Sequence, residues 1–231
     1  MDSYRKTGIS VGLLFISATV ASLLSAMSLD SVLDAPNYLL TVSASGSQMV
    51  ITVILWLIAA TSAVATSFML YPIIRKHIES LSMGYVVLRI FENILYVIGA
   101  VSLLVMLSVS QSYVAGAVDV SYYQALGILL QSLQHWSVTI GTLVFFGLGS
   151  MALNYVLYQS QLIPRWLSLW GLIGAFLALL YGLLAISGLG TGLDSQLTLL
   201  AMPIFIQEML FAVWLIVKGF NSDVITSGIA E

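Results

Sequence analysis

The chain has 231 residues, of which 60% are hydrophobic and only 7% charged, and its formal net charge is −3. An ordinary soluble domain has roughly 25% charged residues, so this composition excludes a water-soluble fold and predicts the lipid bilayer as the main partner. The absence of cysteine and the presence of only two histidines exclude disulfides, iron–sulfur clusters and zinc sites built on cysteine or three histidines. We therefore expect neither a metal nor a cofactor, and without a cluster of Lys and Arg we expect no nucleic-acid binding.

Six long apolar segments predict an all-α membrane helix bundle. Backbone amides in hydrocarbon must be paired within a helix or a closed barrel. Uninterrupted runs of about twenty apolar residues are typical of spanning helices, whereas barrel strands alternate in polarity. Because the connections are short, we predict a single domain over residues 1–231. The six segments lie, in chain order, at 8–27, 48–71, 85–107, 133–158, 165–186 and 197–218.

The basic residues predict the orientation of these spans. Lys and Arg are enriched in the cytoplasmic flanks of membrane helices. Six of the seven basic residues flank the same ends of the spans, and the three opposite connections contain none. We therefore expect both termini in the cytoplasm. The six residues are Arg5, Lys6, Arg75, Lys76, Arg165 and Lys218.

The third span carries a polar face. Arg89, Glu92, Asn93 and Tyr96 are spaced at i, i+3, i+4 and i+7, so all four project from one side of a helix. An ionisable side chain at the centre of a bilayer costs about 2.5–3.5 kcal/mol. This face is therefore expected to point into the bundle, as a site for a ligand or a proton.

The fourth span offers a second, weaker polar stripe. It contains Gln131 and His135, one helical turn apart, near the end of the span that lies away from the basic residues. His135 is a secondary candidate for binding because an imidazole titrates near neutral pH. A hydrogen-bonded structural role is the competing interpretation.

The sixth span carries a second intramembrane carboxyl group. Glu208, with Gln207 beside it, lies ten residues before Lys218, hence about 15 Å from the same end of the helix. We expect Glu208 to meet Arg89 and Glu92, either in a binding pocket or in an ion-pair clamp between the third and sixth spans. Pro203 within this span predicts a kink or break, since proline removes a helical hydrogen bond.

Three segments resemble a bacterial family of six-helix membrane proteins catalogued as a domain of unknown function, of the 4386 type. They are Gly84–Glu92, Leu162–Gly171, and Gln207–Glu208 with Trp214–Phe220. The likeness extends from about Arg5 to Phe220. It implies an inner-membrane location in a bacterium, with Arg89, Glu92 and Glu208 at the family's polar positions, and it implies no activity.

Three functions are compatible with these residues, and the catalytic residues remain unknown. The leading hypothesis is a non-enzymatic bundle that binds a small amphipathic molecule or a lipid, as a carrier, sensor or accessory subunit. The alternatives are a small proton-coupled secondary transporter, for which a homodimer is favoured, and a membrane-embedded enzyme with Glu208 and Glu92 as acid and base.

Overall fold

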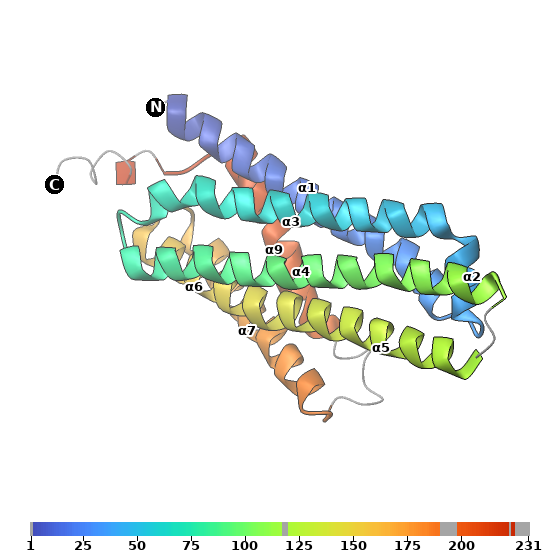
Figure 1. Ribbon diagram of the computed structural model, residues 1–231. Coiled ribbons are helices and arrows are strands. Elements are labelled where there is room, and N and C mark those ends of the chain that lie inside the picture. Colours follow the sequence, from blue (N-terminus) through green and yellow to red (C-terminus); the bar gives the residue numbers. More distant parts are fainter. Residues whose placement is uncertain (1, 117–119, 190–197, 222, 225–231) are drawn as a thin grey trace.

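The computed structural model describes residues 2–116, 120–189, 198–221 and 223–224, and within them it contains helices and no strand. Six helical stretches are long and apolar enough to cross a membrane, which confirms the predicted fold class (Figure 1). The single domain over 1–231 and the side of the membrane on which each end lies stay predictions. The spans are α1 (Asp2–Leu33), α3 (Gly46–Ile74), α4 (Glu79–Val114), the continuous run of α5 (Val120–Thr139), η1 (Ile140–Phe145) and α6 (Phe146–Ser160), then α7 (Arg165–Ile186), and the short turn η2 (Thr198–Leu200) with α9 (Met202–Val217).

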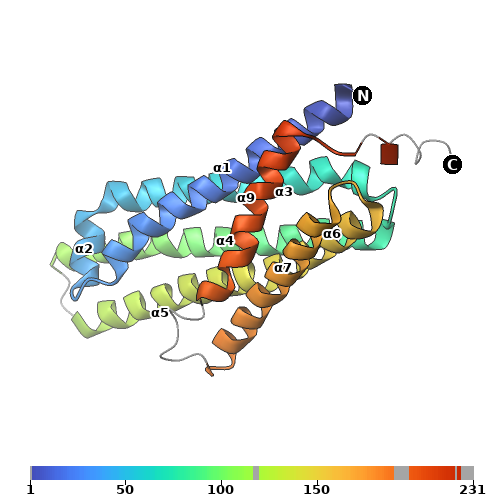
Figure 2. The same ribbon diagram turned by 180° about the vertical axis from the view of Figure 1, so that it is seen from behind.

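The six spans form a closed ring in which each helix packs on the next and the last packs on the first. Contacts run from α1 to α3, α3 to α4, α4 to α5 and α6, α6 to α7, α7 to α9, and α9 back to α1. Helix α4 lies in front of α9 in Figure 1 and behind it when the bundle is turned around in Figure 2. The interior of the ring is therefore bounded by α4 on one side and α9 on the other.

Several helices extend well past the predicted spans. Helix α4 has 36 residues, about 54 Å at 1.5 Å per residue, against a hydrocarbon core of about 30 Å. Helix α1 runs on to Leu33, and a further short helix, α2 (Tyr38–Ala44), follows where the sequence predicted a loop. Hydropathy detects only the part of a helix that must lie in lipid, so packing between helices sets the true ends.

The six flanking basic residues gather at one end of the bundle, which we call the basic end. Arg5 donates hydrogen bonds from its guanidinium to the carbonyl oxygens of Leu215, Ile216 and Val217, the last residues of α9. These carbonyls have no partner inside their own helix. The start of α1 is thereby joined to the end of α9.

Two large apolar clusters of described residues fill the ring, one toward the basic end and one toward the opposite end, and a smaller one lies between α7 and α9. The first contains Leu70 of α3, Tyr85 of α4 and Phe211 of α9, and the second contains Trp56 of α3 and Leu103 of α4. Between the two large clusters lies a layer of polar side chains, which we call the polar belt and which are all buried except the half-buried Glu208. Its members are Ser62, Thr66 and Ser67 of α3, Arg89, Glu92 and Asn93 of α4, Ser150 and Asn154 of α6, and Gln207 and Glu208 of α9.

The predicted kink in the sixth span is wrong. Pro203 lies in the first turn of α9, directly after η2. A proline at this position leaves no helical hydrogen bond unmade, because the first amides of a helix have no intrahelical partner. Pro203 therefore helps to start α9 and does not bend it.

A π-helical segment that the sequence did not predict interrupts the fourth span. This segment, η1, joins α5 to α6 at the level of the polar belt. A Cβ atom added at Gly141 would lie 3.1 Å from the backbone oxygen of Glu92 and 3.2 Å from Cβ of Leu95. The wider turn thus lies directly against α4, at the residues that carry the polar face.

Candidate functional site

Helix α4 supplies the centre of the site through its buried polar face. Arg89 is 4% exposed and Glu92 is 6% exposed. Nη1 of Arg89 donates to both carboxylate oxygens of Glu92, at 2.8 and 3.1 Å, and Nδ2 of Asn93 donates to the backbone oxygen of Arg89 at 2.7 Å. Both members of the ion pair therefore belong to α4. The pair does not clamp the third span to the sixth, which was one of the two arrangements expected from the sequence.

The Arg89 guanidinium lies against aromatic and backbone groups of the neighbouring span. Its Cζ is 5.3 Å from the centre of the Phe146 ring, close enough for a cation–π attraction. Gly149, one turn further along α6, packs beside the aliphatic part of the same side chain, since a Cβ there would lie 3.9 Å from Cδ of Arg89. Helix α6 thus covers one side of Arg89, with the Phe146 ring against its guanidinium.

Three buried polar atoms on α4 and α7 have no hydrogen-bond partner within the described part of the chain. They are the hydroxyl oxygen of Tyr85, Nε of Arg89 and the hydroxyl oxygen of Ser168. Tyr85 precedes Arg89 by one turn of α4 and faces its guanidinium, but the two groups do not meet in hydrogen-bonding geometry. An unsatisfied buried donor costs about 1–3 kcal/mol, so such atoms mark a place where a partner is missing.

Glu208 faces this arrangement from α9. Its side chain is partly exposed, and the charges of Arg89 and Glu92 both act on it. In the residues that the structure describes, the only salt bridge is the one between Arg89 and Glu92, so Glu208 is near the guanidinium without pairing with it. With all three groups ionised, the cluster carries one excess negative charge.

Gln207 belongs to a separate hydrogen-bonded group that joins three helices. It is 1% exposed, and its Nε2 donates to Oδ1 of Asn154 on α6 at 3.3 Å and to the backbone oxygen of Leu167 on α7 at 3.2 Å. Nδ2 of Asn154 donates in turn to the backbone oxygen of Ser150. These bonds fix α9 against α6 and α7 next to Glu208.

Tyr96 closes the polar face toward the end of the bundle opposite the basic residues. Its hydroxyl accepts a hydrogen bond of 3.4 Å from Thr142 in η1. Its ring packs edge-on against Trp56 at 5.7 Å between centres. Tyr96 thus links the π-helical segment to the far apolar cluster.

The two secondary candidates on α5 lie outside the cluster. His135 is exposed, and its ring contacts the neighbouring Trp136 with 5.3 Å between ring centres. Nε2 of Gln131 donates to the backbone oxygen of Leu33 at the end of α1, at 3.5 Å. His135 therefore lies on the helix surface, and Gln131 joins α5 to the end of α1.

A family model described as a domain of unknown function, DUF4386, matches residues 10–219. The chain belongs to the DUF4386 family. Neither a curated protein nor a solved structure matches it. The match takes in all of the polar belt, so the cluster of Arg89, Glu92 and Glu208 lies within the DUF4386 domain.

Sequence reasoning missed four residues of this DUF4386 site. Tyr85 precedes Arg89 by four residues and so lies on the same helical face, which the spacing could have revealed. Phe146, Asn154 and Ser168 carried no such signal, because their place in the site depends on how α6 and α7 pack against α4 and α9. Among the described residues, no three His, Asp or Glu side chains gather as metal ligands would.

Proposed function

We propose that this DUF4386 protein binds the polar end of a small amphipathic molecule or lipid at the polar belt, between α4, α6, α7 and α9. The carrying observation is that Tyr85, Arg89 and Ser168 each leave a buried polar atom without a partner in the described structure. Because such atoms are costly in a low-dielectric interior, a guest that supplies hydrogen-bond acceptors would stabilise the bundle.

The charges of the cluster narrow the chemistry of the guest. Arg89 is already neutralised by Glu92, whereas Glu208 has no countercharge of its own. A suitable guest would offer oxygen acceptors to the unpartnered groups of Tyr85, Arg89 and Ser168. It would also carry a hydroxyl or amine that donates to Glu208. The apolar tail of the guest would extend from this site between the helices toward the lipid. The role that follows is a carrier, sensor or accessory subunit in the bacterial inner membrane, with both termini cytoplasmic.

Glu208 also supports a second candidate, a small proton-coupled transporter. A carboxyl group that lies near a guanidinium without being locked to it is free to exchange a proton as a substrate comes and goes. The enzymatic alternative has less support. Both oxygens of Glu92 accept from Arg89, which leaves this carboxylate poorly placed to act as a base.

Native mass spectrometry of the protein purified in mild detergent tests the binding proposal. We expect a co-purified molecule on the unaltered chain, and about fivefold lower retention in Tyr85→Phe, because a single hydrogen bond is worth about 1 kcal/mol. Tyr155→Phe is the matched control, since Tyr155 is on the exposed surface of α6. An unaltered protein that carries no guest, or equal retention in both variants, would contradict the proposal.

The same material separates the two candidates. The molecule identified on the unaltered protein is supplied to proteoliposomes that contain a pH-sensitive dye. Transport predicts proton flux that Glu208→Gln abolishes while the folded yield stays unchanged. Binding without transport predicts no flux in either protein.

A further inference from the structure

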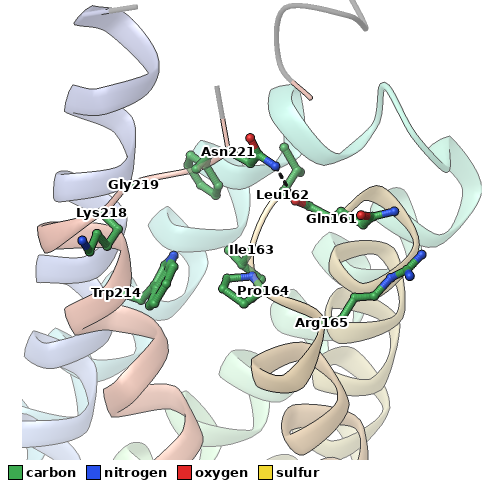
Figure 3. Close-up of a pocket in the computed structure, with 10 residues that line it drawn as sticks. Gln161, Leu162, Ile163, Pro164, Arg165, Trp214, Lys218, Gly219 and Asn221 are labelled. Atoms are coloured by element: carbon green, nitrogen blue, oxygen red, sulfur yellow. Dashed lines mark hydrogen bonds between the residues drawn. The ribbon is translucent and has the colours of Figure 1, made fainter. Parts of the chain in front are cut away.

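A pocket at the basic end lies apart from the polar belt. It has a volume of about 490 Å³, within the usual size range of ligand pockets. One wall is the connection between α6 and α7 with the first residue of α7, and the other is the end of α9 with the segment that follows it. The backbone amide of Asn221 donates to the oxygen of Leu162 at 2.9 Å and its side chain to the oxygen of Gln161 (Figure 3), so the two walls are joined.

Two left-handed residues shape these walls. Gln161 ends α6 with φ of 56°, and Gly219 follows α9 with φ of 76°. Each turns the chain sharply away from its helix. The floor between them is apolar, since Leu162, Ile163 and Phe220 are all buried.

The charge of the pocket has one sign. Lys218 and Arg165 lie on opposite sides of it, with Trp214 and Pro164 between them (Figure 3). Both cations are exposed, and none of the described lining residues is acidic. The pocket therefore favours an anion.

Two tryptophans indicate that the pocket lies at the level of the lipid headgroups. The rings of Trp166 and Trp214 pack edge-on at 6.5 Å, and tryptophan is enriched at the level of lipid headgroups. Below them, the outer faces of α7 and α9 expose Leu169, Ile173 and Val213. An acyl chain could follow this apolar surface directly from the pocket, which a soluble anion would not use.

We propose that this pocket binds the phosphate headgroup of an anionic phospholipid, with the acyl chains along α7 and α9. This site is independent of the function proposed above, because it lies at the surface of the basic end and shares no residue with the polar belt.

Lipid titration followed by native mass spectrometry tests the site. The probes are phosphatidylglycerol and phosphatidylcholine with the same acyl chains. The pocket variant is Arg165→Gln with Lys218→Gln, and the matched control is Arg75→Gln with Lys76→Gln, which removes two charges from the same end. Arg75 lies over Tyr71 as Arg165 lies over Tyr158, at 5.6 and 5.5 Å, so each double variant loses one arginine–tyrosine contact. The control also loses the contact of Lys76 with the ring and hydroxyl of Tyr4, so it removes at least as many interactions as the pocket variant.

We expect preferential binding of phosphatidylglycerol to the unaltered protein, about tenfold weaker binding in the pocket variant and little change in the control. The single variant Lys218→Gln, with an exposed side chain, serves if the double variant folds poorly, and it should show part of the loss. Equal losses in pocket variant and control, or no preference for the anionic lipid, would overturn the proposal. Displacement of the lipid by inorganic phosphate would assign the pocket to a soluble anion instead. Tyr85→Phe should leave lipid binding unchanged, which separates this site from the polar belt.

Discussion

Arg89 and Glu92 neutralise each other on one face of α4, and this pairing lets a guanidinium lie in the middle of an apolar bundle. Removing one member of a buried pair leaves an uncompensated charge, which is far costlier than removing both. The two residues are therefore expected to act as one unit in stability, although Nε of Arg89 still has no partner in the described part of the chain.

Replacing Arg89 alone should destabilise the bundle strongly. We expect Arg89→Ala to lower the free energy of unfolding by about 3–5 kcal/mol. The double variant with Glu92→Ala should recover part of this loss, because no buried charge is left alone. Thermal unfolding in detergent measures both. A double variant no more stable than Arg89→Ala would show that the pairing itself contributes little.

The residues of the site divide into those that the sequence could predict and those that it could not. The spacing of Arg89, Glu92 and Asn93 predicted one buried face, and the structure confirms it. The sequence placed Glu208 at the depth of Arg89 and Glu92, and its position near them depends on how α9 packs in the ring. Gln207, predicted as a binding residue, has its amide nitrogen occupied by Asn154 and Leu167, and only the folded helices determine this.

Helices α7 and α9 approach each other closely at a glycine of α7. A Cβ atom at Gly174 of α7 would lie 2.7 Å from the backbone nitrogen and 2.9 Å from Cα of Ile204 on α9. Small residues allow such approaches between membrane helices. Gly174, Ala178 and Gly182 recur every four residues along α7, and all three serve packing within the chain, the first two against α9 and Gly182 against Leu143 of η1.

Gly174→Ala should push α9 away from α7 and lower the free energy of unfolding by about 1–3 kcal/mol, as overpacking does. Gly84→Ala on α4 is the control, because nothing lies within 4 Å of a Cβ at Gly84, and there alanine should stabilise the helix by about 0.5–1 kcal/mol. Both are measured by thermal unfolding in the same detergent. Opposite signs are expected, and a stable Gly174→Ala protein would mean that α9 adjusts without cost.

The sequence predicted the helices better than their ends. Hydropathy located all six spans, because the cost of exposing polar backbone to lipid dominates there. It did not reveal the extension of α4, the short helix α2 or the π-helical turn η1, which depend on contacts between helices. Pro203 was assigned to the wrong part of its helix because the start of α9 is set by η2, which hydropathy does not distinguish from the span.

In the whole molecule, the ring is closed by contacts between its first and last helices. Arg5 bonds three carbonyls at the end of α9. A Cβ at Gly12 of α1 would lie 2.6 Å from the backbone oxygen of Ala212 on α9. The two helices therefore lie backbone to backbone.

Arg5→Ala should open this closure. Hydrogen bonds to charged groups contribute about 1.5–3 kcal/mol, so we expect a loss of about 2 kcal/mol in the free energy of unfolding and a clear drop in Tm. Lys6→Ala is the control, since Lys6 is exposed. Tryptophan fluorescence during heating in detergent follows both variants. Equal Tm values for the two would indicate that the bonds of Arg5 are replaced by water.

The contact between α1 and α9 can form only at the end of synthesis. Helix α1 is synthesised first and α9 last. The face of α1 that carries Gly12 therefore lacks its α9 partner while the four intervening spans are inserted. During this time Arg5 lacks the carbonyl acceptors at the end of α9. Glu208 comes near Arg89 only when that final helix is released, so the cluster of Arg89, Glu92 and Glu208 is complete only after translation has passed the last span.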